Sequence, residues 1–199
     1  PLDRGKQTFD LALATSEDIR GTILLPNGKP AAAAMVYLVT PGNYMTIMEG
    51  PRVPFSKAAH VKTEADGRYR FPCALGNWRL VAFRPEGYAE IGSKSFAAPG
   101  NLVLQPWGRL QGICNRNGKP YADCRIELRP YPPWHDPNLA EVQFHFSATT
   151  DDAGRFLFAH VPGGQATVYC CPPGSTGAHR APSREQAVTV ASGQTSRVE

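Results

Sequence analysis

The sequence has no long apolar run and few charged residues. None of its apolar stretches approaches the roughly 20 residues of a membrane helix, so we expect no membrane insertion. Charged residues make up 19% of the 199 residues, and the net charge of +4 is spread along the chain without a Lys/Arg cluster. This pattern argues against a nucleic-acid partner. Residues 1–5 lack an initiator Met and the charged-then-apolar order of a signal peptide. We therefore expect the sequence to be part of a larger parent chain.

Common catalytic and metal-binding patterns are also missing. The sequence contains no Gly-x-Ser-x-Gly elbow and no phosphate-binding loop. It has no C-x-x-C or His-x-His pair of the kind that binds zinc. His135-Asp136, near Asp151-Asp152 in the sequence, is a weak cation candidate, and turn capping explains such aspartates better. The sequence predicts no enzyme activity, no cofactor and no metal site.

The cysteines give no clear disulfide pattern. There are five, which leaves at least one thiol outside any intramolecular disulfide. A bond between Cys114 and Cys124 is disfavoured, because the two lie several residues out of register across their hairpin. Cys114, Cys124 and Cys170 fall at inward positions of expected strands, where cysteine acts as a small hydrophobe. We therefore expect buried core thiols; the remaining two cysteines are Cys73 and Cys171.

The sequence is rich in turn-forming residues and in alternating patterns. Gly and Pro occur 19 times each, about 19% of the chain against roughly 12% on average. Cys124, Ile126 and Leu128 alternate with polar residues, and Tyr69 and Phe71 alternate with arginines. A period of two is typical of strands with one buried and one solvated face. No stretch has helical periodicity with credible caps, so we expect short strands joined by turns.

An internal repeat organises the chain. The tetrapeptide Asn-Gly-Lys-Pro occurs at residues 27–30 and again at residues 117–120, and several further landmarks recur in the same order at offsets of 87 to 91. Six or seven short strands in about 90 residues suit a β-sandwich. We predict one sandwich over residues 17–107 and a second over residues 108–199. Residues 1–16 are expected to form an N-terminal strand or the end of a preceding repeat.

The ordered motifs of both copies resemble the carboxypeptidase regulatory-like domain, a transthyretin-like (prealbumin-like) β-sandwich. The resemblance covers residues 17–199 and departs from the family at Gly174-Ser175 and at two long loops. It implies an all-β fold of two tandem transthyretin-like Greek-key β-sandwiches. It also implies a non-catalytic accessory module of an exported protein, whether periplasmic, cell-surface or extracellular. The matching segments are residues 21–23, 27–30, 34–36, 63–69, 76–78 and 87–88 in the first copy, and 112–114, 117–120, 122–126, 150–156 and 163–168 in the second.

The two long loops carry the candidate binding residues. In the second loop, residues 130–139, Tyr131 and Trp134 could form a stacking platform stiffened by prolines, with His135, Asp136 and Asn138 orienting a ligand. The first loop, residues 41–55, offers an adaptable apolar surface for a protein partner that includes Tyr44, Met48 and Phe55. The alternative is that each loop covers its own sandwich or packs between the two domains. Trp107, at the junction, is expected to wedge between the two copies.

Two functional hypotheses follow from this reading. The first is an interaction module that binds a protein or a cell-surface glycan through the long loops. The second is a purely structural spacer without a ligand. Both are non-catalytic.

Overall fold

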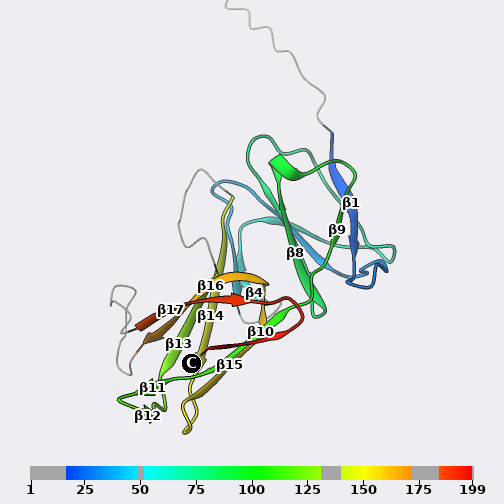
Figure 1. Cartoon of the computed structure of the whole chain (residues 1–199). Coiled ribbons are helices and arrows are strands. Elements are labelled where there is room, and N and C mark those ends of the chain that lie inside the picture. Colours follow the sequence, from blue (N-terminus) through cyan, green and yellow to red (C-terminus); the bar gives the residue numbers. More distant parts are fainter. Residues whose placement is uncertain (1–16, 49–51, 131–139, 172–183, 199) are drawn as a thin grey trace, which may run out of the picture.

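The computed structural model describes residues 17–48, 52–130, 140–171 and 184–198. Within these ranges the fold is all-β, with strands β1 to β18 and one 3-10 turn, Ser93–Ser95 (Figure 1). None of the helices in this part of the chain has the length and apolar character needed to cross a membrane. The predicted N-terminal strand of residues 1–16 lies outside the described residues.

The N-terminal half, strands β1 to β9, contains two sheets. One has the order β6-β1-β9, with β9 parallel and β6 antiparallel to β1. The other has the order β5-β2-β7-β8 and is antiparallel throughout. The strands are β1 (Ile19–Leu24), β2 (Met35–Val39), β5 (Ala59–Lys62), β6 (Arg68–Phe71), β7 (Arg79–Arg84), β8 (Gly87–Gly92) and β9 (Gly100–Val103).

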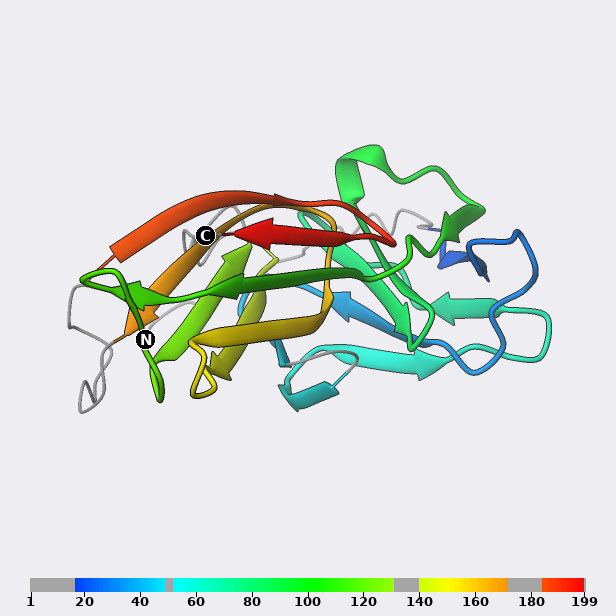
Figure 2. The same ribbon diagram turned by 60° about the horizontal axis from the view of Figure 1, so that its bottom comes forward.

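The C-terminal half, strands β10 to β18, has the same strand order. Its smaller sheet runs β15-β10-β18, with β18 parallel to β10, and its larger sheet contains β14-β13-β16-β17. A short hairpin, β11-β12, follows β10. The strands are β10 (Gly108–Ile113), β11 (Asn115–Arg116), β12 (Lys119–Pro120), β13 (Arg125–Pro130), β14 (Val142–Thr149), β15 (Arg155–Val161), β16 (Gly164–Cys171), β17 (Arg184–Val190) and β18 (Thr195–Val198). Figure 2 shows the two halves end to end.

A hairpin of the N-terminal half joins the sheet of the C-terminal half. It consists of β3 (Met45–Met48) and β4 (Arg52–Ser56), and β3 pairs in parallel with β14. The larger C-terminal sheet therefore has six strands in the order β17-β16-β13-β14-β3-β4. The expectation of a long loop over residues 41–55 was wrong, because this segment finds backbone partners in the other half of the chain. The sequence pattern within one copy of the repeat does not reveal strand partners in the other copy.

The core explains why β2 is apolar along its whole length and β7 is apolar between its terminal arginines. Val36 and Leu38 pack into a core made only of N-terminal strands, whereas Tyr37 and Val39 belong to a second core that extends into the C-terminal half. β2 therefore has no solvated face. Strands buried on both faces read as continuous apolar runs rather than as alternating ones. The alternation does hold in β6, where Tyr69 and Phe71 are buried between exposed arginines.

Aromatic rings connect the halves within this second core, which we call the shared core. Tyr88 of β8 contacts Trp107 at a ring-centroid distance of 5.4 Å and Phe144 of β14 at 6.0 Å. Trp107 is buried, contacts His160, and donates its indole N–H to the carbonyl of Arg84 at 2.7 Å. The tryptophan at the junction thus packs between the halves.

Candidate functional site

The sequence-predicted residues of the first loop lie on or beside the β3-β4 hairpin. Tyr44 and Phe55 stack with ring centroids 5.6 Å apart, and the Lys57 ammonium lies 5.7 Å from the Tyr44 ring centroid. Phe55 is 50% exposed and Met48 is 40% exposed. Since β4 is the edge strand of the six-stranded sheet, this aromatic pair lies at the sheet edge. The structure therefore brings Tyr44 and Phe55 together on an accessible surface.

The residues predicted on the second loop are not placed by the structure. Tyr131, Trp134, His135, Asp136 and Asn138 lie outside the described residues. Their role as a binding platform stays a prediction from the sequence.

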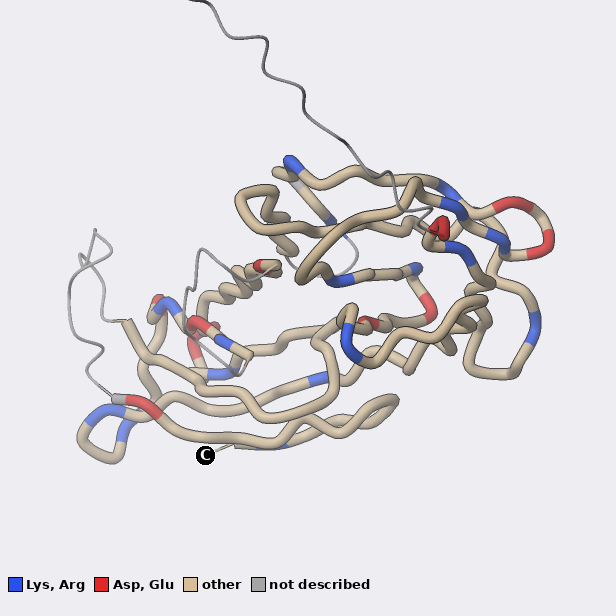
Figure 3. The backbone as a smooth tube through the Cα atoms, turned by 90° about the horizontal axis from the view of Figure 1, so that it is seen from above, with Lys and Arg blue, Asp and Glu red and all other residues tan. Residues whose placement is uncertain are grey.

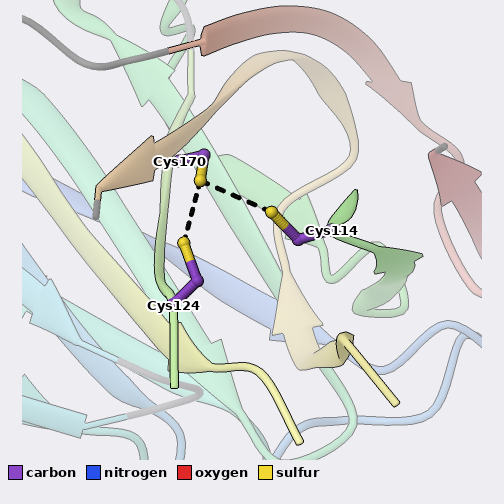
Figure 4. Close-up of side chains that lie close together, drawn as sticks. All are labelled: Cys114, Cys124 and Cys170. Carbon is purple, nitrogen blue, oxygen red and sulfur yellow. Dashed lines mark hydrogen bonds between the residues drawn. The ribbon is translucent and has the colours of Figure 1, made fainter. Parts of the chain in front are cut away.

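Three cysteines of the C-terminal half come together, which the sequence analysis did not predict. The Sγ atoms of Cys124 and Cys170 are 2.8 Å apart, and those of Cys114 and Cys170 are 3.4 Å apart. All three sulfur atoms lie within 4.8 Å of one another. Figure 4 shows the side chains converging with Cys170 in the middle. We call this group the thiol cluster.

The strand register brings the thiols together. Cys124 directly precedes β13 and shares an inward face with Ile126, and Cys170 of β16 lies opposite Ile126. Cys114 directly follows β10 in the smaller sheet, so the cluster spans both sheets of the C-terminal half. Cys171 is adjacent to Cys170 and points to the other face of β16.

A buried threonine fixes the backbone beside the cluster. The Thr150 hydroxyl accepts the N–H of Cys124 at 2.9 Å and donates to the carbonyl of Tyr121 at 2.7 Å. Thr150 is only 3% exposed, so both bonds form away from water, where an unmade bond is costly. Thr150 therefore holds Cys124 in place from one side.

A cavity of about 330 Å³ opens beside the cluster. Cys114 and Cys170 line it and are half-buried, whereas Cys124 is fully buried behind them. Arg116 and Glu185 contribute charged groups to the lining. The Arg116 guanidinium lies 5.3 Å from the Tyr121 ring centroid and donates to the Tyr121 hydroxyl at 3.2 Å. The apolar part of the lining includes Ile126, Phe156, Val168 and Val198.

The surroundings of Cys124 keep its thiol protonated. Burial raises the pKa of this thiol, and the neighbouring Cys170 and Cys114 raise it further. Because the thiolate is the nucleophilic form of cysteine, a raised pKa makes Cys124 a poor nucleophile. This environment argues against covalent catalysis by Cys124.

The N-terminal half provides an internal comparison for Cys124. Thr63 repeats the threonine arrangement: its hydroxyl accepts the N–H of Ala34 at 2.8 Å and donates to the carbonyl of Ala31 at 2.6 Å. Ala33 and Asp123, which directly precede Ala34 and Cys124, both have positive φ, 58° and 53°. Cys124 therefore corresponds to Ala34.

Cys114 and Cys170 have counterparts that are found in the same way. Cys114 corresponds to Ile23, because both donate their backbone N–H to the carbonyl of a turn glycine. The acceptor is Gly154 for Cys114, at 2.8 Å, and Gly67 for Ile23, at 2.9 Å. Cys170 corresponds to Ala82 by strand register. Cys170 lies opposite Ile126, two positions after Cys124, and Ala82 lies opposite Val36, two positions after Ala34. The fold thus accepts ordinary apolar residues at all three places, and the cysteines are a property of the second copy alone.

The sequence contains a signal for the cluster that was missed. The three cysteines are separated by 10 and 46 residues along the chain, a spacing that does not match a C-x-x-C ligand pair. Aligning the two copies strand by strand and asking where cysteine replaces an apolar residue selects these three positions and Cys171, whose counterpart is Phe83. Strand alternation then sets Cys171 apart, because it points to the other face of β16.

Exposed charges of both signs are intermixed over the described part of the chain, as Figure 3 shows. Several arginines pair locally with carboxylates, as do Arg68 with Asp66 at 3.2 Å and Arg155 with Asp151 at 3.8 Å. Such exposed pairs contribute little to stability, about 0–1 kcal/mol each.

Comparisons with known proteins give fold-level likeness only. No family model matches the sequence, and no curated protein matches it. Among solved structures, the chain is similar to GBS52, the minor pilin of Streptococcus agalactiae, with 15% identity over 90% of this chain and 93% of that chain and a TM-score of 0.41. It is similar to a streptococcal ancillary pilin, with 11% identity over 90% of this chain and 61% of that one and a TM-score of 0.40. The shaft pilin SpaA of Lactobacillus rhamnosus GG gives 10% identity over 91% and 96% and a TM-score of 0.33. These values assign no family to the chain.

Proposed function

We propose that this chain is a non-catalytic structural module of a larger exported or cell-surface protein, in which two transthyretin-like β-sandwiches form one stiff unit. The proposal includes the division into residues 17–107 and 108–199, preceded by residues 1–16, and membership of the carboxypeptidase regulatory-like group. The matching strand order of the two halves supports the division. Export rests on the motif resemblance.

The observation that carries the proposal is the pairing of β3 with β14. Met45 and Ile47 are fully buried and lie opposite Val142 and Phe144. The Thr46 hydroxyl also donates to the side-chain oxygen of Gln143 at 3.3 Å. Two domains linked only by a peptide would move independently. A continuous sheet and a shared core resist bending, which suits a spacer.

The chemistry of the described residues supports a non-catalytic role. Among these residues, the thiol cluster is the one group of three or more His, Cys, Asp or Glu side chains close enough to bind one ion. The raised pKa of Cys124 is the opposite of what a nucleophile needs.

The stiffness of the chain can be tested by ¹⁵N relaxation on the whole protein. We expect one rotational correlation time for amides of both halves. A variant in which residues 44–57 are replaced by a short Gly-Ser turn should show separate, shorter correlation times. Independent tumbling of the halves in the unmodified chain would contradict the spacer proposal.

Binding of a protein or glycan is the second candidate, and the exposed Tyr44–Phe55 pair favours it. Accessible aromatic faces are typical of hot spots in protein interfaces. The sequence adds Met48 and, from the second loop, Tyr131, Trp134, His135, Asp136 and Asn138 as candidate contacts.

The binding candidate can be tested with a screen of polysaccharides, cell-wall material and surface proteins. Saturable binding should be weakened at least tenfold by Phe55→Ala or Trp134→Ala. Leu75→Ala is the matched control, because Leu75 is 86% exposed and lies away from the hairpin in the sequence. Equal loss in all three variants, or no binding at all, would leave the spacer as the function.

A further inference from the structure

The thiol cluster combines three features that a buried apolar core does not require. Three cysteines replace the counterparts Ile23, Ala34 and Ala82, all of which are 0% exposed. The sulfur atoms of the cysteines meet within 4.8 Å. A cavity reaches two of them from outside. The N-terminal half shows that the same backbone packs well without thiols, so packing alone does not explain the three replacements.

We propose that Cys114, Cys124 and Cys170 bind a zinc ion through three thiolates, with the fourth coordination position facing the cavity. The ion displaces the three thiol protons, including the one that burial keeps on Cys124, and they pass to solvent. Zinc takes cysteine sulfur at about 2.3 Å in tetrahedral sites, which places sulfur atoms about 3.8 Å apart. The observed separations of 2.8 and 3.4 Å reach this value through side-chain movements of about 1 Å or less. Soft thiolate ligands select zinc or cuprous copper over magnesium and calcium.

The charges beside the site favour the divalent ion. Three thiolates leave a net charge of −1 with Zn²⁺ and −2 with Cu⁺. The cavity lining adds one cation, Arg116, and one carboxylate, Glu185. It therefore supplies no net positive charge to compensate the −2 charge of a Cu⁺ site. Zinc is therefore the better-balanced occupant.

The surrounding backbone holds the ligands before the ion binds. Thr150 fixes the N–H of Cys124, and the turn glycine Gly154 accepts the N–H of Cys114. Cys170 is held in β16 between β13 and β17. Outer hydrogen bonds of this kind are what orients metal ligands. The cavity gives the ion an access route from solvent.

The test uses the full chain, reduced and freed of metal, titrated with Zn²⁺ against a chromophoric chelator. We expect one zinc per chain. The decisive variant carries Cys114→Ile, Cys124→Ala and Cys170→Ala, which are the residues that the N-terminal half already has at these places, so the fold should be retained. Its circular dichroism spectrum should match that of the parent chain, and its zinc affinity should fall at least 100-fold.

Cys73→Ser is the matched control, because Cys73 is exposed and lies outside the cluster. This variant should bind one zinc with unchanged affinity. Cobalt substitution should give a thiolate-to-metal charge-transfer band in the parent chain and in the control, but not in the triple variant.

Several results would overturn the proposal. Absence of zinc binding by the reduced chain would show that the three cysteines serve only as core residues. Equal affinity in the triple variant would show that zinc binds elsewhere. Tight binding of Cu⁺ without binding of Zn²⁺, measured under anaerobic conditions, would replace zinc by copper. A disulfide between two of the three cysteines that persists in the natively purified chain, together with no zinc uptake after reduction, would make the cluster a covalent staple. The proposal does not depend on the spacer function, because all three cysteines lie in the C-terminal half and the spacer proposal rests on the pairing of β3 with β14.

Discussion

Truncation of Ile47 tests whether the β3-β4 hairpin makes the two halves one cooperative unit. Ile47 is fully buried in the shared core and lies opposite Phe144 of the other half. Ile47→Ala removes three buried carbons at about 0.8 kcal/mol each, and the cavity left behind raises the loss to about 3–4 kcal/mol. Unfolding entropy of about 2.1 cal/mol/K per residue gives roughly 0.4 kcal/mol/K for the chain. We therefore expect Tm to fall by roughly 8 °C.

Differential scanning calorimetry gives the direct measurement. At about 0.7 kcal/mol per residue, one cooperative unit has a van't Hoff enthalpy of about 140 kcal/mol, whereas two independent halves have about 70 kcal/mol each. We expect the unmodified chain to give the larger value and Ile47→Ala to move towards the smaller one, because its substitution weakens the contact between the halves. Ile23→Ala is the matched control: the same side chain is removed from a fully buried site in the N-terminal core.

The control should lose comparable stability while the ratio of van't Hoff to calorimetric enthalpy stays near one. The reasoning would be refuted if the unmodified chain already melted in two transitions of about 70 kcal/mol. It would equally be refuted if Ile47→Ala left Tm within about 2 °C of the parent value.

Three further predictions concern stability. Thr150→Val should lower the free energy of unfolding, measured by chemical denaturation, by about 2–3 kcal/mol, because two buried backbone groups lose their hydrogen-bond partner. Thr63→Val should lower it by the same amount. A loss below about 0.5 kcal/mol in either variant would contradict the role of these threonine hydrogen bonds. Gly21→Ala should cost about 3 kcal/mol, because an added Cβ would lie 1.7 Å from a backbone oxygen of β9, and an unchanged Tm would refute this close approach. Burial raises the pKa of Tyr69 and of Tyr88, the latter also through Glu90. The folded and unfolded states are equally protonated below pH 10, and above it the unfolded chain loses protons that the folded chain keeps. The free energy of unfolding should therefore fall by up to about 1.4 kcal/mol per pH unit for each tyrosine, and Tyr69→Phe should flatten this dependence.

The sequence predicted those features that depend on neighbours along the chain. Alternation predicted β6 and β13, and the excess of Gly and Pro predicted short strands joined by turns. Even this local information has a limit, because the identical Asn-Gly-Lys-Pro segments form different turns. Asn117 and Gly118 both have positive φ, whereas Asn27 does not. Three residues separate Ile23 from Asn27, whereas two separate its counterpart Cys114 from Asn117, and a two-residue turn closes the β11-β12 hairpin in the second copy.

The features that the sequence did not predict depend on partners in the other half of the chain or on another sheet. Residues 45–48 became a strand because β14 offers a free edge, and Tyr37 and Val39 are buried because they belong to the shared core, which extends into the C-terminal half. The thiol cluster likewise needs the register of β13 with β16 and the position of β10 in the opposite sheet. None of these relations is visible from the spacing of residues along the chain.

The crossing hairpin also sets the order in which the molecule can be completed. Thr46 meets Gln143, which follows 97 residues later. At 5–20 residues per second, a ribosome needs roughly 5–20 s to supply this partner strand. Throughout that interval Met45 and Ile47 have no β14 to pack against, although β9, the last strand of the N-terminal half, is complete at Val103, 40 residues before Gln143. The nascent chain therefore carries apolar residues without their partner strand until β14 has been made. We expect the pairing of β3 with β14 to follow the formation of the sheets of the N-terminal half.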